Sequence, residues 1–146
     1  MSDRSGSRID LTLIVDSFAW IEFLSAGRAG PSVRTHLESS EELVTPDIVL
    51  AEVARVFGRQ GMPRITIEGH LRSIGVLSSV RPIDVQVAIE AIESEADLRQ
   101  KARSEKLGMP SFADCIILAF ARSLQAQVLT ADSHFRGLQE TVWIGV

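Results

Sequence analysis

Short apolar runs bounded by polar or turn-forming residues recur along the chain and predict strands. The run at residues 9–15 alternates at first and then becomes wholly apolar, which is typical of a strand whose end is buried inside a sheet. Shorter runs predict further strands at 43–44, 80–83, 128–130 and 142–144. The pattern therefore indicates a sheet of four to five strands.

Between these runs, apolar residues recur at helical spacing. They predict helices over 18–24, 31–40, 47–59, 65–77, 84 to about 103 and 112–124, with one further helical turn at 135–138. Thr45 is expected to cap the helix at 47–59 with Pro46 at its first position, and Ser111 to cap the helix at 112–124. Strands that alternate with helices through short loops predict a three-layer α/β/α domain with a central, mainly parallel sheet.

The length of 146 residues suits one domain, which we expect over 9–146 behind a flexible arm at 1–8. The arm is small and polar and no apolar run approaches a membrane helix in length, so a membrane partner is not expected. The single cysteine, Cys115, excludes an internal disulfide and is interpreted as a small buried hydrophobe. We therefore expect a cytoplasmic protein.

The formal net charge of −4 gives no general reason to expect a nucleic-acid partner. The basic residues are nevertheless thirteen Arg and only two Lys, a bias that suits bidentate contacts with phosphate. Arg55, Arg59 and Arg136 are the candidate phosphate-binding residues. A solvated helix face is the alternative interpretation for such charges.

Four acidic residues, Asp16, Glu52, Asp114 and Asp132, stand at element ends or inside apolar segments. Asp16 and Asp132 each follow a predicted strand, and ligands of parallel sheets bind outside the carboxyl ends of the strands. If all four converge, their repulsion is costly unless a divalent cation lies among them. The three histidines lie far apart in the sequence, and none is included in this set of candidate ligands. A site of carboxylate oxygens without histidine or thiol ligands favours Mg²⁺ or Mn²⁺ over zinc.

Each acid also has a purely structural interpretation that the sequence leaves open. Asp16 could cap the helix that follows it, and Asp114 stands three residues after Ser111 in a capping-box arrangement. Asp132 could form an Asx-turn, and Glu52 could form a solvated ion-pair face with neighbouring arginines. No single acid decides between a site and a set of caps.

The ordered set of segments resembles the PIN-domain family of metal-dependent ribonucleases, most closely the small toxins of VapBC-type toxin–antitoxin pairs. The segments that carry the resemblance are 13–21 (LIVDSFAWI), 45–53 (TPDIVLAEV), 114–121 (DCIILAFA) and 128–135 (VLTADSHF). The resemblance implies that Asp16, Glu52, Asp114 and Asp132 form an acidic quartet supported by Thr130. It also implies that Asp16 and Asp114 are the main metal ligands, with Glu52 and Asp132 acting directly or through water. Phe18 departs from the family pattern, where a small residue is common.

By this resemblance the chain is expected to be a Mg²⁺- or Mn²⁺-dependent endoribonuclease that hydrolyses RNA phosphodiesters. It is further expected to be a toxin that forms a homodimer and is inhibited by an antitoxin protein. Two alternatives remain open: a PIN-like nuclease of RNA processing without a toxin role, and a catalytically silent binding module.

Overall fold

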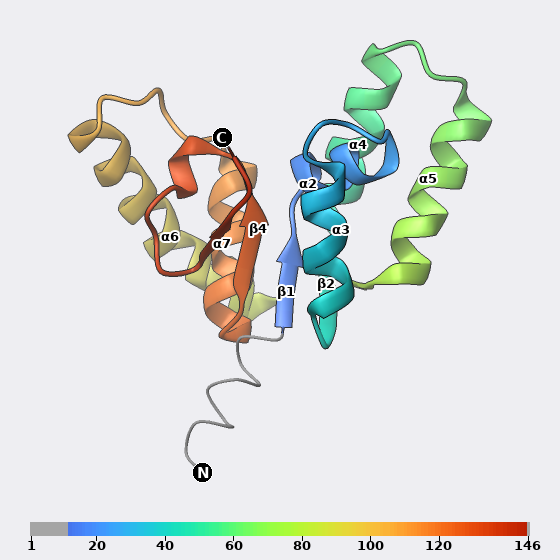
Figure 1. The fold of residues 1–146 in the computed structure, drawn as a ribbon. Coiled ribbons are helices and arrows are strands. Elements are labelled where there is room, and N and C mark those ends of the chain that lie inside the picture. Colours follow the sequence, from blue (N-terminus) through green and yellow to red (C-terminus); the bar gives the residue numbers. More distant parts are fainter. Residues whose placement is uncertain (1–11, 146) are drawn as a thin grey trace.

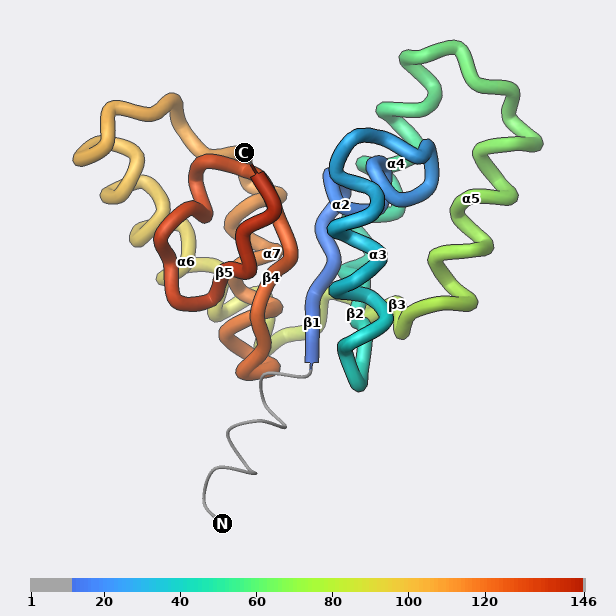
Figure 2. The backbone as a smooth tube through the Cα atoms, viewed as in Figure 1, coloured from blue at the N-terminus to red at the C-terminus, as the bar shows by residue number. Residues whose placement is uncertain are grey.

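A single parallel sheet forms the centre of the computed structural model, which describes residues 12–145 (Figure 1). Its strands are β1 (Thr12–Val15), β2 (Glu42–Pro46), β3 (Ser79–Arg81), β4 (Gln127–Thr130) and β5 (Thr141–Trp143). Their spatial order is β3-β2-β1-β4-β5, and all four neighbouring pairs are parallel (Figure 2). This confirms the predicted sheet. The expected arm at 1–8 and the first residues of the predicted strand, 9–11, lie outside the described residues.

Six α-helices and one short 3₁₀-helix connect the strands of the described chain. They are α2 (Ser17–Leu24), α3 (Gly30–Ser39), α4 (Asp47–Arg59), α5 (Arg64–Leu77), α6 (Val85–Ser104), α7 (Phe112–Leu124) and η1 (Ser133–Phe135). Polar residues cap three of them, because the side chains of Asp16, Asp84 and Ser111 each accept a backbone N–H of the first turn; the cap at Ser111 confirms the prediction. None of the helices within 12–145 is long and apolar enough to cross a membrane.

Two local predictions are wrong. Thr45 does not cap α4, because it is buried in β2 and its hydroxyl accepts the indole N–H of Trp20 at 3.0 Å. The buried indole needs that acceptor, so the threonine is retained in the sheet. The helical turn expected at 135–138 instead forms at Ser133–Phe135, because Asp132 Oδ1 accepts the backbone N–H of His134 at 2.9 Å and starts the turn earlier.

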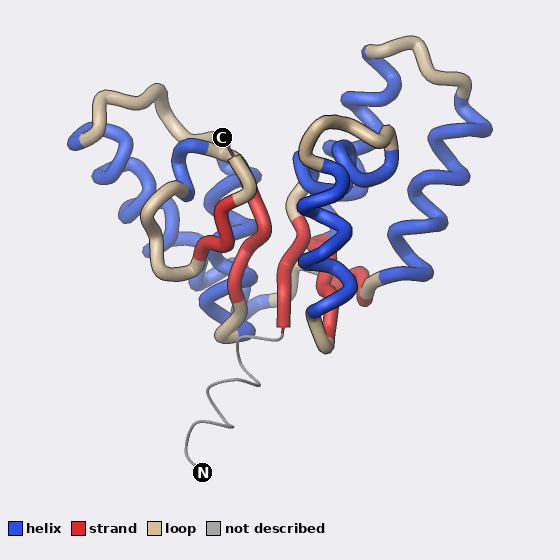
Figure 3. Tube along the Cα trace, viewed as in Figure 1, coloured by secondary structure: helices blue, strands red, loops and turns tan. Residues whose placement is uncertain are grey.

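The helices lie in two layers on either side of the strands (Figures 1 and 3). Helices α6 and α7 pack against each other, whereas α2 contacts both α3 and α4, and α4 contacts α5. Right-handed crossovers explain this division, because the chain adds β2 and β3 in one direction from β1 and then returns to add β4 on the other side. The predicted three-layer architecture is confirmed.

The reversal of strand order between β1 and β4 determines where a ligand crevice can form. In open parallel sheets such crevices lie at the carboxyl ends of the two strands that flank the reversal. Helix α7 ends at Leu124 only two residues before β4, so it runs antiparallel to that strand and begins at the same carboxyl edge. The start of α7 and the ends of β1 and β4 therefore meet at this edge.

Candidate functional site

Asp16 lies directly after β1 and serves as the N-cap of α2. Its Oδ1 accepts the backbone N–H of Ala19 at 2.9 Å, and only 6% of the residue is exposed. Burial raises the pKa of Asp16 to about 7; hydrogen bonds from Thr130 and Ala19 oppose this rise, and the charges of Asp132 and Glu52 add to it. Asp16 is thus a helix cap and, at the same time, a carboxylate held beside two other acids.

Asp132 follows β4 and is held by the backbone around it. Its N–H donates to the hydroxyl of Thr130 at 3.0 Å, and its Oδ1 accepts the backbone N–H of His134 at 2.9 Å. Thr130 is fully buried, and its side chain also reaches Asp16, so it links the two acids that flank the reversal of strand order. Thr130 therefore contacts both acids.

Asp114 occupies the first turn of α7 and forms a capping box with Ser111. The N–H of Asp114 donates to Ser111 Oγ at 3.1 Å, and the N–H of Ser111 donates to Asp114 Oδ2 at 3.3 Å. Burial, followed by the charge of Asp132, raises the pKa of Asp114 to about 6 against the lowering effect of the Ser111 hydrogen bonds. The capping role that the sequence left open is real, and it orients the carboxyl toward Asp132.

Glu52 reaches the same edge from the second turn of α4. It lines a small depression with Arg55 and Ala113, the residue that precedes Asp114. Burial raises the pKa of Glu52 and the charge of Asp132 raises it further, whereas Ser17 and Arg55 lower it. Its Oε1 is buried and has no hydrogen-bond partner among the described residues. A buried carboxylate oxygen without a donor requires a cation or an ordered water nearby.

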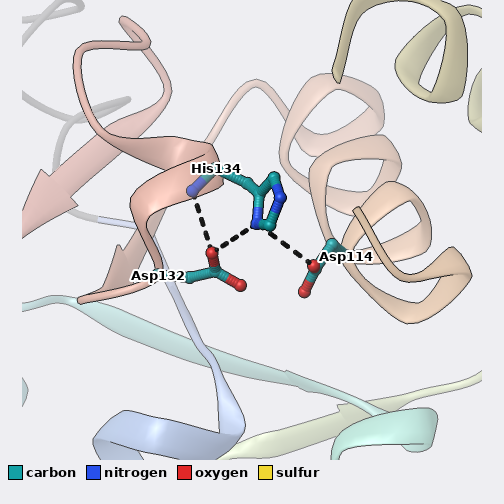
Figure 4. Close-up of side chains that lie close together, drawn as sticks. All are labelled: Asp114, Asp132 and His134. Atoms are coloured by element: carbon teal, nitrogen blue, oxygen red, sulfur yellow. Dashed lines mark hydrogen bonds and ion pairs between the residues drawn. The ribbon is translucent and has the colours of Figure 1, made fainter. Parts of the chain in front are cut away.

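His134 lies within the acidic cluster, although the sequence interpretation assigned it no role. Figure 4 shows its ring between two carboxylates, with Nδ1 2.9 Å from Asp132 Oδ1 and 4.0 Å from Asp114 Oδ2. On the other side, Nε2 lies 2.7 Å from the carbonyl oxygen of Gly108. Both neighbours of the ring are acceptors, so this geometry favours the imidazolium form, which donates from both nitrogens.

The pKa of His134 follows the same geometry. Burial lowers this pKa, but the hydrogen bonds to Gly108 and Asp132 and the charges of Asp132 and Asp114 outweigh burial, and the net shift is upward. The acids and the Gly108 carbonyl beside the ring thus favour its protonated form. The position of His134 two residues after Asp132 was a signal in the sequence; its contact with Gly108 was not.

The residues at this edge fit a divalent cation. Within 12–145, Asp114, Asp132 and His134 each offer one ligand atom, and these atoms lie within 4.8 Å of one another. The orphaned Oε1 of Glu52 and the raised pKa values of three carboxyls indicate the same deficit of positive charge. Two carboxylates with one imidazole suit Mn²⁺ as well as Mg²⁺, provided that His134 releases its Nδ1 proton.

The structure thus brings together all four predicted acids and Thr130, each within electrostatic or hydrogen-bonding reach of another. Asp16 lies outside the tightest group of possible ligands, where His134 stands instead. The predicted phosphate-binding residues are all exposed, but only Arg55 influences one of the acids, Glu52. Cys115 is buried as expected, and burial raises the pKa of its thiol to about 11, which keeps it protonated.

Comparison of the sequence with known protein families finds a match over most of the chain. The family model of the PIN domain matches residues 13–140. No protein among those with curated descriptions matches the sequence.

Three solved structures illustrate the shared fold. A toxin–antitoxin complex from Klebsiella pneumoniae has 19% identity and a TM-score of 0.68, covering 92% of this chain and 99% of that one. The toxin VapC20 of Mycobacterium tuberculosis, which cleaves the sarcin-ricin loop, has 18% identity and a TM-score of 0.64, covering 87% and 95%. VapBC2 of Rickettsia felis, solved with a DNA fragment of its promoter, has 12% identity and a TM-score of 0.64, covering 90% and 96%.

Proposed function

The chain belongs to the PIN domain family, and from this we propose that it is a metal-dependent endoribonuclease that acts as the toxin of a toxin–antitoxin pair. The observation that carries the proposal is the convergence of Asp16, Glu52, Asp114 and Asp132 at the reversal of strand order, with His134 as the cation in contact with two of them. Solved neighbours that are toxins of such pairs support the cellular role.

We assign the binding of Mg²⁺ or Mn²⁺ to Asp114 and Asp132, with Asp16 and Glu52 ligating directly or through water. When bound, the ion supplies a positive charge that polarises the phosphodiester and makes water a better nucleophile. His134 competes for the same carboxylate oxygens while it is protonated, because its Nδ1 lies 2.9 Å from Asp132 Oδ1.

The side chains of the cluster divide the remaining tasks of hydrolysis. The capping box fixes Asp114 and the Thr130 hydroxyl fixes the backbone of Asp132, so the two carboxylates are held in place before substrate arrives. Glu52, with one oxygen free of hydrogen bonds among the described residues, is placed to orient the attacking water and accept its proton. Water then adds to phosphorus as its proton passes to Glu52, the bond between phosphorus and the 3′ oxygen breaks, and the 3′ oxygen takes up a proton from solvent to leave as a hydroxyl.

Replacement of Asp114 by Asn tests this assignment. Asn keeps the size and the capping acceptor but loses the charge, so we expect Mn²⁺-dependent cleavage of single-stranded RNA to fall at least about 100-fold. Glu93→Gln, at an exposed position of α6, is the matched control and should cleave at the wild-type rate. Equal cleavage by the Asp114 variant and the wild type would refute the assignment.

The toxin role is tested separately in cells. Induction of the wild-type chain alone should arrest growth in a bacterial host, and induction of the Asp114→Asn variant should not. RNA cleavage in vitro without growth arrest would favour a role in RNA processing, whereas Mn²⁺ binding without cleavage would favour a silent binding module.

We further propose that the protein acts in the cytoplasm as a homodimer. One face of α6 exposes three large apolar side chains at helical spacing: Val85 is 81% exposed, Ile89 63% and Ile92 67%. Exposed apolar patches of this kind mark surfaces that are covered by a partner. We expect Ile89→Glu to convert a dimer into a monomer in light scattering. A monomeric wild-type protein would remove this part of the proposal.

A further inference from the structure

A pocket of about 560 Å³ adjoins the acidic cluster and plays no part in the chemistry described above. It lies between α2, the start of α3, the segment that follows β4, and the end of β5. Ala131 and Ser133 line it on both sides of Asp132, and Phe18 lines it two residues after Asp16. We propose that this pocket binds a nucleotide of the RNA substrate next to the scissile phosphate.

Two aromatic side chains give the pocket surfaces on which a base can stack. Phe18 is 41% exposed, whereas Trp20 of the same helix is fully buried. Trp143 is half-buried at the end of β5, and the backbone of Gly145 lies so close to its indole that an added Cβ would fall 2.3 Å from the ring. The indole is therefore packed closely against the backbone of Gly145, and such a supported ring suits a stacking platform.

Two arginines give the pocket its charge. The guanidinium of Arg136 lies 5.1 Å from the centre of the Trp143 ring, and the exposed Arg28 also lines the pocket. None of the ion pairs between side chains of residues 12–145 engages either arginine. Both guanidinium groups are thus available to a phosphate.

Glu22, the acid that lines the pocket, offsets one of the two arginine charges, so the lining keeps a net positive charge. Glu22 accepts the backbone N–H of Ala29 at 2.8 Å, and its carboxyl lies against Gly27, where an added Cβ would meet it at 2.5 Å. Glu22 therefore holds the turn between α2 and α3, while Arg28 in that turn faces the pocket. The net charge of the pocket lining therefore favours an anionic ligand.

A nucleotide fits these features better than an apolar segment of a partner protein. Its base needs an aromatic or guanidinium surface, its phosphate needs cations, and the volume lies within the usual ~300–1,000 Å³ of small-molecule sites. Because the pocket lies beside Asp132, an RNA strand with one nucleotide in the pocket can place its neighbouring phosphate at the acids. This inference rests on the proposed ribonuclease function, because it assigns the neighbouring part of the same substrate.

Binding of RNA in EDTA separates the pocket from the chemistry. A 12-nucleotide single-stranded RNA of mixed sequence is titrated against the full chain and followed by RNA anisotropy and tryptophan fluorescence. Trp20 is fully buried, so a fluorescence change on binding reports mainly on Trp143. We expect Arg136→Ala and Arg28→Ala each to weaken binding about 5- to 10-fold, with a shallower salt dependence.

The controls use residues that share the chemistry but not the location. Arg72→Ala, at an exposed position of α5, should change affinity less than about 2-fold. Phe18→Ala should weaken binding as the arginine variants do, and Trp143→Phe should keep most of the affinity while it abolishes the fluorescence change. In Mn²⁺, the arginine variants should raise KM and leave kcat unchanged.

The outcomes distinguish the pocket from the proposed function. Pocket variants that weaken RNA binding in a protein that cleaves no RNA would uphold the pocket and refute the nuclease. Equal RNA affinity of all the variants, or no RNA binding by the wild type, would overturn the pocket even if cleavage is normal. Variants that lose affinity only for an antitoxin protein would also overturn it, because the occupant would then be a peptide.

Discussion

The two ends of α7 use acidic residues in opposite ways. At its last turn, Arg122 donates from Nε to Glu140 at 3.1 Å and from Nη1 to Asp97 at 2.8 Å, so one cation serves two carboxylates. At its first turn, Asp114 and Asp132 flank the imidazole of His134, and Asp16 and Glu52 add to the negative charge near Asp132. At the last turn the guanidinium donates to both carboxylates, whereas at the first turn the imidazole lies beside only two of the four acids.

The pKa shifts at the two ends follow this difference. Burial lowers the pKa of Arg122, but its hydrogen bonds to Asp97 and Glu140 more than compensate and raise it. At the other end, burial raises the pKa of Asp16 to about 7 and that of Asp114 to about 6. In an ion pair that only stabilises the fold, each carboxylate has a cationic donor. A group of buried acids with too few cations beside it instead indicates a binding site for a cation.

Removal of the Asp16 charge is the strongest way to sharpen this comparison. Below pH 4 Asp16 is protonated in the folded and unfolded chain and costs nothing, and between pH 4 and 7 only the unfolded chain ionises, so stability falls as pH rises. Above pH 7 the cost levels off at about 4 kcal/mol. We therefore expect Asp16→Asn, in EDTA at pH 8, to be about 2–4 kcal/mol more stable than the wild type.

Urea unfolding at pH 4, 6 and 8 measures this effect, which should disappear at the lowest pH. Asp84→Asn, the same substitution at the cap of α6, is the matched control and should gain no such stability. An Asp16 variant less stable than the wild type at pH 8 would mean that the carboxylate is not held at a cost.

Loss of the Arg122 ion pairs should lower the stability of the protein and leave its RNA cleavage unchanged. Arg122 is 22% exposed and Glu140 is 19% exposed, so Arg122→Ala leaves a partly buried carboxylate without its donor. We expect a loss of about 1–3 kcal/mol in unfolding free energy and normal RNA cleavage per folded molecule. Arg99→Ala, which breaks an exposed pair at 3.9 Å, should cost less than about 0.5 kcal/mol. A cleavage defect as large as that of Asp114→Asn would erase the distinction between the two ends.

The cap of α7 links stability to the site and should give the smallest effect. Ser111→Ala removes the acceptor of the Asp114 N–H, and we expect a loss of about 1 kcal/mol. Cleavage should fall only a few-fold, because the Asp114 carboxylate remains. Ser104→Ala, at the exposed end of α6, is the control. A variant with intact stability would show that the capping box contributes little to α7.

The sequence predicted most of the fold because its caps and apolar periods are local. Ser111 caps its helix as predicted, and Asp16 takes the capping role that the sequence left open, since each cap depends only on the next three residues. Thr45 was misjudged because its hydroxyl pairs with Trp20, 25 residues away, a contact that no local pattern specifies.

The candidate site was likewise predicted only where local sequence patterns or the family resemblance specify it. Asp16 and Asp132 follow strands and could be placed at one edge, and the resemblance to a family supplied the rest of the quartet. The role of His134 depends on Gly108, 26 residues earlier, and only the folded chain brings that carbonyl to the ring. The pocket lined by Phe18, Arg28 and Trp143 likewise joins elements from both ends of the chain.

The central claim is that the acids at the start of α7 form a divalent-cation site, and calorimetric titration of Mn²⁺ into the apo protein at pH 7.5 tests it most directly. We predict saturable binding to the wild type, at least about 10-fold weaker binding to Asp114→Asn, and unchanged binding to Asp97→Asn, the variant at the opposite end. Absence of saturable binding, or equal binding by all three proteins, would contradict the claim.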